Sequence, residues 1–301
     1  MNKLFFLLFL FSVMITSCDN GDDTIEPITG RLLEIKGSQY DENRYFFLGH
    51  FFRENYERWL EEIPLITSGV NIHRLEVYVL SRNNEDNNIR SIVALMDLGE
   101  ATRIHSPDVT ANGNLLVNNL NLAWNGANDL FSKLTEYDEN LVEADLLAKL
   151  PSFESSTDYV RLTTARKLDD TEFTVNQELG YIRLLRRLQS DEVLAVSYQY
   201  SYNGELFQVG EIESDYFNRN DDEVIYLKML RPNNIATELN TWDLMMKNAY
   251  NLNATQVSEE GFQLNIVYRN DITGQDVVSL PEGQLLKDVL LLEALKLDQL
   301  N

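Results

Sequence analysis

The sequence has few of the residues from which disulfide frameworks and zinc centres are built. It contains one cysteine and three histidines in 301 residues. A single thiol cannot form a disulfide within the chain. His50, His73 and His105 stand far apart, without the short spacing that places two imidazoles on one helix face. We therefore expect no metal site, and we interpret His50 as an interior residue rather than a ligand.

Positive charge is also scarce. The chain has 25 lysines and arginines against 48 aspartates and glutamates, which gives a formal net charge of −23. Nucleic acids and anionic lipid headgroups repel a polyanion of this kind. We therefore exclude nucleic acid as a partner and interpret the acidity as a means of staying soluble. Contact with basic partners or with cations is the alternative.

Sequence motifs of catalysis are missing as well. There is no phosphate-binding glycine loop and no G-x-S-x-G turn. Adjacent carboxylates such as Glu61 and Glu62 arise by chance in so acidic a chain. Residues 215–223 and 270–276 offer oxygen ligands suited to calcium but lack the pattern of an EF-hand loop, and we interpret both as solvated turns. We expect a protein that is not an enzyme and uses no cofactor.

One apolar run stands at the N-terminus. Leu4 to Ile15 follows a short basic segment and has the length of a signal-peptide core, too short for a helix that spans a bilayer. The next residues, Thr16-Ser17-Cys18, resemble a bacterial lipobox, in which the thiol is acylated. Acyl chains on Cys18 would satisfy the requirement for two anchoring signals in stable membrane attachment. An ordinary cleaved leader with an incidental cysteine is the alternative.

These features predict a lipoprotein signal peptide over residues 1–17, lipid attachment at Cys18 and a flexible acidic tether over residues 18–30. The expected location is the cell envelope, as an outer-membrane lipoprotein held to the membrane by its lipid. The acidic residues after the cysteine resemble surface-export signals, so the cell surface and the periplasmic face both stay open.

The rest of the chain predicts an α+β fold with mainly antiparallel sheets and packed helices. The clearest element is a β-hairpin around Asn203-Gly204, a dipeptide that readily adopts positive φ at both turn positions. Residues 110–123 fit a strand or a loop. By period and composition, strands are expected at residues 31–36, 72–80, 89–96, 193–202, 205–211, 224–230 and 261–269, and helices at residues 44–62, 127–135, 139–150, 242–250 and 284–297. Helices alternate with polar strands, so we expect no transmembrane barrel.

Pro151 and the serines after it suggest a boundary between two α+β halves, residues 31–152 and 153–301. An aromatic helix followed by a loop and a strand is expected in each half, at residues 44–80 and 242–269. Because the same order of elements recurs, the two halves could be similar α/β sandwiches.

Three tyrosines, Tyr198, Tyr200 and Tyr202, share one face of the first hairpin strand. They could pack as cross-strand aromatics or form an exposed platform for a glycan. We favour packing.

Several segments resemble SprA (Sov), the outer-membrane translocon of gliding motility and type IX secretion. They follow the family order and comprise Ile35–Gly37, Tyr45–Arg53, Ser91–Gly99, Thr164–Leu168, Leu179–Ile182, Asp191–Val196, Tyr202–Gly204, Val209–Glu211 and Trp242–Asn248. The family protein is a very large barrel with long soluble insertions, and this chain resembles one such soluble region. The family is not ordinarily lipidated, which puts secretion activity itself in doubt, and it offers no catalytic residues to carry over.

The resemblance implies a lipid-anchored accessory or interaction module in protein secretion or gliding motility, with secretion or gliding components as partners. A surface glycan-binding lipoprotein is the second hypothesis. A non-functional fragment of a translocon gene and an unrecognised hydrolase are further alternatives.

Overall fold

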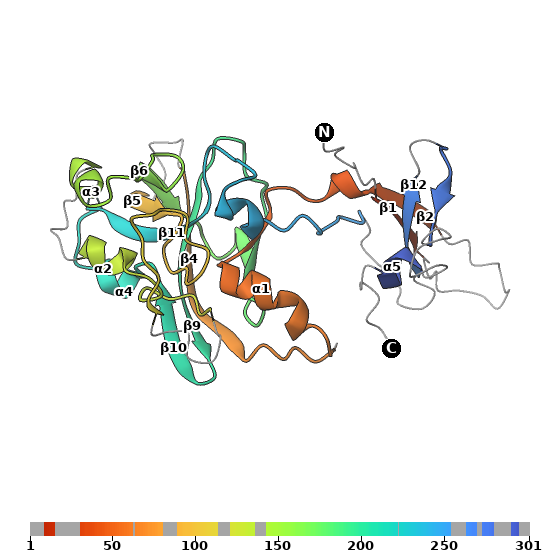
Figure 1. Ribbon diagram of the computed structural model, residues 1–301, viewed down its shortest axis with the longest axis horizontal. Coiled ribbons are helices and arrows are strands. Elements are labelled where there is room, and N and C mark those ends of the chain that lie inside the picture. Colours follow the sequence, from red (N-terminus) through yellow and green to blue (C-terminus); the bar gives the residue numbers. More distant parts are fainter. Residues whose placement is uncertain are drawn as a thin grey trace. The chain divides into compact units, whose positions relative to one another are not determined.

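The computed structural model describes residues 9–15, 31–62, 64–80, 89–113, 121–135, 143–221, 223–253, 263–269, 273–279 and 290–294. The expected lipid-attachment residue Cys18 and the expected tether lie outside these residues. The chain forms two compact units, a larger one of Asn43–Met246 and a smaller one of Met1–Glu42 with Lys247–Asn301. Figure 1 shows their helices and strands. The expected α+β class with mainly antiparallel sheets is confirmed.

The larger unit is built on a six-stranded sheet. Its order is β10-β9-β11-β5-β6-β4, and β4 pairs with β9 as well. The strands are β4 (Val70–Leu80), β5 (Ile89–Leu95), β6 (Tyr159–Lys167), β9 (Leu194–Tyr202), β10 (Glu205–Val209) and β11 (Ile225–Arg231). Among these strands β5 and β11 run parallel, and the other pairs are antiparallel.

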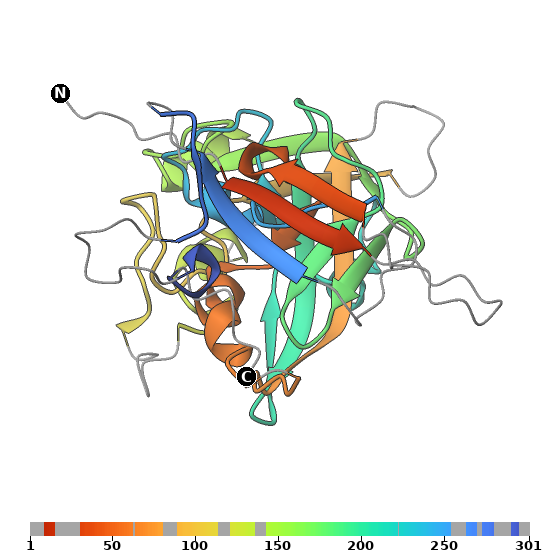
Figure 2. The same ribbon diagram turned by 90° about the vertical axis from the view of Figure 1, so that its right-hand side faces the viewer.

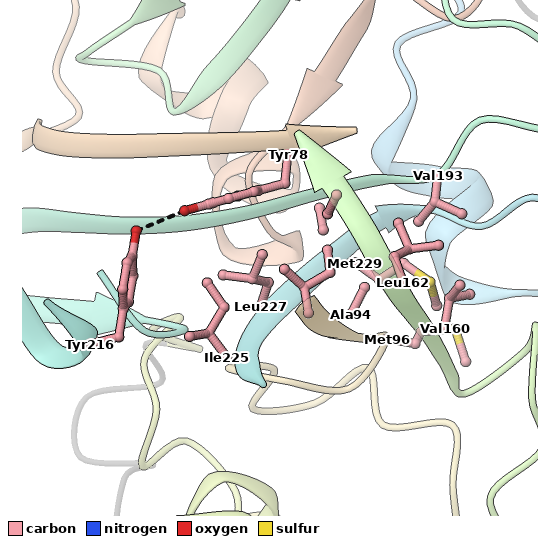
Figure 3. Close-up of a cluster of buried hydrophobic side chains, with 13 residues drawn as sticks. Tyr78, Ala94, Met96, Val160, Leu162, Val193, Tyr216, Ile225, Leu227 and Met229 are labelled. Carbon is pink, nitrogen blue, oxygen red and sulfur yellow. Dashed lines mark hydrogen bonds between the residues drawn. The ribbon is translucent and has the colours of Figure 1, made fainter. Parts of the chain in front are cut away.

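Alternating residues of these strands form the core. Ile225, Leu227 and Met229 of β11 share one face and pack with Tyr78 of β4 and Ala94 of β5 in a single buried cluster (Figure 3). Period-two alternation places the intervening residues on the opposite face of the sheet. Both faces of β11 are buried, and none of its seven residues is exposed to solvent.

The opposite face packs against α1 (His50–Trp59). The rings of Phe51 and Phe52 contact those of Tyr198 and Tyr200 at centroid distances of 5.3–6.0 Å. Helices α2 (Leu130–Thr135), α3 (Glu143–Lys149) and α4 (Glu213–Tyr216) lie on the other side of the sheet from α1 (Figure 1). Contacts between aromatic rings thus hold α1 against β9.

A second sheet completes the larger unit, in the order β3-β8-β7. Its strands are β3 (Tyr45–Phe47), β7 (Phe173–Asn176) and β8 (Tyr181–Leu184). The two ends of the unit meet beside it, since Phe46 forms a β-bridge with Met245 and the Met246 amide donates to the Tyr45 carbonyl at 3.0 Å.

Two expected helices differ from the structure. The helix expected at residues 44–62 begins only at His50, because Tyr45–Phe47 pairs with β8 as a strand. The prediction of a helix at residues 242–250 is wrong. The short 3₁₀ helix η3 (Asn240–Leu244) ends at Leu244, and Met245 is extended. In both places pairing between distant segments overrides local helix propensity.

The smaller unit contains a four-stranded antiparallel sheet in the order β13-β12-β1-β2. Its elements are β1 (Phe9–Ile15), β2 (Arg31–Lys36), the 3₁₀ helix η1 (Gly37–Gln39), β12 (Gln263–Arg269), β13 (Asp276–Val277) and α5 (Leu291–Ala294). Most of the helix expected at residues 284–297 lies outside the described residues. The described part of the expected signal-peptide core, Phe9–Ile15, therefore forms strand β1 of this sheet, drawn in red in Figure 2.

The compact units differ from the two halves expected on either side of residue 152. Strands β5 and β6 come from opposite sides of that boundary, yet they pair over six residue positions in one sheet. Within the part of the chain that the structure describes, no helix is long and apolar enough to cross a membrane.

Candidate binding cavity

A cavity with a volume of about 950 Å³ opens on the larger unit. It lies where β4 passes the end of β6, the start of β7 and the helix α4. Its lining comprises His73, Arg74, Leu75, Glu76, Tyr78, Ile89, Arg90, Lys167, Leu168, Asp169, Asp170, Phe173, Val175, Glu213, Tyr216, Phe217, Arg219 and Asp221. Charged side chains of both signs and several aromatic rings therefore line the same cavity.

Glu76 lines the cavity and is only 7% exposed, and we call this carboxylate with the groups bound to it the cavity floor. Its carboxylate accepts a hydrogen bond from the Tyr216 hydroxyl at 2.5 Å and one from the Glu213 amide at 3.0 Å. The Lys167 ammonium lies 3.0 Å from the same carboxylate. A buried carboxylate is stable only when it is paired and hydrogen-bonded in this way. The floor is therefore a rigid polar network.

Two tyrosine hydroxyls extend this network. The Tyr78 and Tyr216 oxygens lie 2.7 Å apart, and Figure 3 shows the two side chains meeting end to end. Tyr216 donates to the Glu76 carboxylate at 2.5 Å, and the single proton of Tyr78 can go to Tyr216 or directly to Glu76 at 3.1 Å. We call these contacts the tyrosine relay. The strand β4 and the helix α4 are joined by this relay.

Burial raises the pKa of both tyrosines above the ordinary value, and the negative charge of Glu76 adds to the effect. Both hydroxyls therefore remain protonated at neutral pH and act as hydrogen-bond donors. A general base needs a pKa near the working pH. The two tyrosines are suited to orientation rather than to proton abstraction.

Arg90 fixes the loop that follows α4. Its guanidinium stacks over the Tyr216 ring at 4.3 Å from the centroid. It donates to the Asn220 carbonyl at 3.1 Å and lies 3.4 Å from the Asp221 carboxylate. This stacking and pairing hold one wall of the cavity in place.

The rim of the cavity contrasts with its floor. Phe217 is 71% exposed, which is high for a large apolar side chain. Arg74, Asp169 and Asp170 of the same lining are exposed as well. An exposed ring among charges of both signs can contact a polar partner by stacking and by ion pairing. The arrangement fits binding of a polar ligand or of a partner surface.

The tyrosines singled out in the sequence do not line this cavity. Tyr198 and Tyr200 are both 0% exposed and pack against α1, which confirms the expected packing. The Tyr200 hydroxyl donates to the Ala123 carbonyl at 2.9 Å. Tyr202 is partly exposed and its ring contacts Phe51. The three rings therefore form no flat exposed row.

The three histidines lie in different surroundings. His50 is 2% exposed, as expected for an interior residue. His73 lies on the cavity wall, with Nε2 2.9 Å from the Ser201 hydroxyl. The His105 amide donates to the Asp97 carboxylate at 2.9 Å. Across the described ranges, no three histidine, cysteine or acidic side chains converge closely enough to hold a metal ion.

The two acidic stretches considered for calcium differ from simple loops. Residues 213–216 form α4, and Asp215 accepts from the Ile212 amide at 3.0 Å. Asp276 pairs with Arg269 at 2.7 Å, while residues 270–272 lie outside the described residues. The side chains of Asp215 and Asp276 are thus bound to protein groups.

A second polar cluster lies in the core of the larger unit. Lys228 is 0% exposed, and its ammonium lies 2.7 Å from the Glu100 carboxylate and also contacts the Met96 carbonyl. His50 Nδ1 is 3.0 Å from the same carboxylate oxygen. Burial alone would raise the pKa of Glu100, but Lys228 and His50 outweigh it and hold the pKa at about 2. All three side chains of this cluster are buried, so the charges of Lys228 and Glu100 are shielded from solvent.

Sequence reasoning missed both polar groups. Glu76 is one of many acidic residues, and nothing local shows that Tyr216 reaches it across 140 positions. Lys228 could have been noticed, because it interrupts the apolar strand IYLKMLR.

The chain matches no protein-family model. No curated protein matches it as a relative.

Proposed function

We propose that the chain is a non-enzymatic lipoprotein of the bacterial envelope, anchored through Cys18 at the outer membrane. It acts as an accessory or interaction module in protein secretion or gliding motility, and its cavity contacts the partner. The observation that carries the proposal is the cavity, with a fixed polar floor and an exposed rim of mixed charge around Phe217.

The state of the floor supports binding over catalysis. Glu76 is held by an ammonium, a hydroxyl and a backbone amide, so it has no free position from which to act on a substrate. A catalytic carboxylate must reach the reacting atom directly or through one water. Two of the three tyrosines proposed as a glycan platform are buried, so they cannot contact a glycan at the surface.

The anchor is tested by labelling cells with a radioactive fatty acid. The wild-type chain incorporates label, and Cys18→Ala does not, because the thiol that is acylated has been removed. Ser17→Ala is the matched control and keeps its label, since alanine is also small. Equal labelling of the wild-type chain and Cys18→Ala would refute the anchor.

The binding role is tested by affinity isolation from envelope fractions. The wild-type chain recovers secretion or gliding components, and Phe217→Ala recovers several-fold less. Leu206→Ala is the control, because Leu206 is 60% exposed on β10 and does not line the cavity. Recovery of only unrelated proteins, or equal recovery by both variants, would contradict the role.

A further inference from the structure

A second, smaller cavity adjoins the candidate binding cavity of the larger unit. Its volume is about 150 Å³, and Leu168 lines both cavities. Residues of β4 and β8, and of the segments that follow β6 and β8, form its wall. The remaining lining residues are Val79, Thr171, Glu172, Leu184, Leu185, Arg186 and Leu188. We call this cavity the leucine pocket.

The leucine pocket has an apolar interior and an exposed mouth. Four aliphatic side chains of its lining are buried, namely Val79, Leu168, Leu184 and Leu188, which are 2%, 8%, 2% and 4% exposed. Leu185 belongs to the same lining but is 47% exposed. A cavity of about this volume with apolar walls stays dry and holds one benzene-sized molecule. The pocket therefore has room for one leucine-sized side chain that enters from the surface.

The charged side chains of the leucine pocket are already paired within the protein. Arg166 donates to both carboxylate oxygens of Glu172, at 2.6 and 2.9 Å. Arg186 donates to both carboxylate oxygens of Glu192, each at 2.8 Å. Such bidentate pairs satisfy both charges and fix the geometry of the side chains. Glu172 and Arg186 therefore shape the pocket without favouring a ligand of either charge.

Unpaired charge lies on the short segment that joins the two cavities. Asp169 and Asp170 stand between Leu168 and Thr171 and line the larger cavity. Both are exposed, and neither carboxylate binds another group within the described residues. Arg74 is the one exposed cation of that lining in the same situation, so the unpaired groups of the described lining sum to a negative charge. A cationic group beside an apolar one complements this surface.

We propose that the leucine pocket and the adjacent aspartates bind a segment of a partner protein in which a leucine-sized apolar side chain stands next to lysine or arginine. The apolar side chain fills the pocket, and the basic side chain pairs with Asp169 and Asp170. The inference rests on the proposed function and names the chemistry of the partner. A buried apolar anchor supplies affinity, and the charges select the partner.

The test uses the full 301-residue chain with Cys18→Ala, so that no lipid is attached. The probe is the peptide Gly-Ser-Leu-Lys-Lys-Ser-Gly, and binding is followed by NMR of leucine and valine methyl groups. We expect saturable shifts at Val79, Leu184 and Leu188 and none at Leu206, which lines neither cavity. Unchanged pocket methyls at millimolar peptide would overturn the proposal.

Two peptide variants separate the apolar contact from the charge. A peptide with alanine in place of leucine binds about tenfold more weakly or worse, because three fewer carbons are buried in the pocket. A peptide with two glutamates in place of the lysines gives no saturable shift, since like charges repel. Equal binding of the leucine and alanine peptides would overturn the pocket as the site, and equal binding of the lysine and glutamate peptides would overturn the charge preference.

A matched pair of protein variants tests the aspartates. Asp169→Asn with Asp170→Asn keeps the shape of both side chains and lowers the affinity for the lysine peptide by about three- to fivefold. Glu61→Gln with Glu62→Gln removes the same charge from two exposed residues that line neither cavity, and it leaves the affinity unchanged. Equal losses in the two variants would trace binding to net charge and overturn the site.

Two further outcomes concern the choice of partner. Pocket methyl shifts that change on dilution of the peptide-free protein would show that a second copy occupies the pocket, which overturns the partner proposed. Recovery of only unrelated proteins in the affinity isolation would refute the proposed function, whereas the methyl shifts test the pocket without any envelope protein. Full recovery of secretion or gliding components by Asp169→Asn with Asp170→Asn, together with absent shifts, would overturn this inference and leave the proposed function standing.

Discussion

Lys228 lies in the middle of β11, where its ammonium is enclosed by the core and faces Glu100. Replacement of Glu100 by glutamine keeps the shape of the side chain but leaves the lysine without its counter-charge. We expect Glu100→Gln to lower the free energy of unfolding by about 3 kcal/mol at pH 7, measured by urea denaturation. Asp129→Asn breaks the half-exposed pair with Lys133 and should cost less than about 1 kcal/mol.

The loss in Glu100→Gln should depend on pH. The pKa of Glu100 is lowered to about 2 in the folded protein from 4.5. A lowered carboxylate pKa contributes stability that is complete above the unfolded value and is lost as the pH falls through the folded value. The difference between wild-type protein and variant should therefore shrink from pH 4.5 towards pH 2. A constant difference across this range would argue against an ionised Glu100.

The Tyr216 hydroxyl donates to the buried Glu76 carboxylate in the cavity floor. Tyr216→Phe removes the hydroxyl that donates to Glu76 at 2.5 Å and contacts Tyr78 at 2.7 Å, so the buried carboxylate loses its shortest donor. We expect a loss of about 1–3 kcal/mol in the free energy of unfolding. Tyr226→Phe is the matched control, because the Tyr226 hydroxyl makes no hydrogen bond within the described part of the chain. Equal effects of the two variants would show that the relay contributes nothing.

For single residues, the sequence predicts which side chains are buried better than it predicts which side chains contact one another. The packing of Tyr198 and Tyr200 follows from their place on one face of a strand, and His50 lies in the interior as expected. The contacts of Glu76 and Glu100 join residues 50 to 140 positions apart along the chain. No local pattern encodes such pairs, because they depend on how the sheet is assembled.

At the scale of elements, the β9–β10 hairpin has the turn expected from its dipeptide. Asn203 and Gly204 have φ of 50° and 86°. A Cβ at Gly204 meets no atom within 4 Å, so Gly204→Ala tests backbone conformation alone. We expect a loss of about 1 kcal/mol in urea denaturation. Gly113→Ala also adds its Cβ in open space and has no positive φ, so it should be close to neutral. Neutrality of both variants would contradict a strained turn.

Elements with a strong local pattern were predictable, and those defined by distant pairing were not. Strands β2, β4 and β5 lie within two residues of their expected bounds, since apolar composition marks them and β4 also alternates with period two. Strand β3 was expected to be helical, because its aromatic residues continue the spacing of α1. Its pairing with β8, about 136 positions away, decides the conformation instead.

At the scale of the whole molecule, the division of the chain follows sheet pairing rather than the proline and serines near residue 152. The larger unit is one continuous segment, and its two ends meet at the Phe46–Met245 bridge. A segment whose ends meet can be excised without breaking its sheet, because the cut bonds lie at its periphery.

We therefore expect residues 43–246 to fold alone. The purified fragment should show one cooperative urea transition, with slow amide exchange in β5, β9 and β11. The matched fragment 31–152 should remain largely unfolded, because it contains β4 and β5 but lacks β6, β9 and β11, their partners in the sheet. Cooperative folding of 31–152, together with an unfolded 43–246, would instead favour two halves that meet at residue 152.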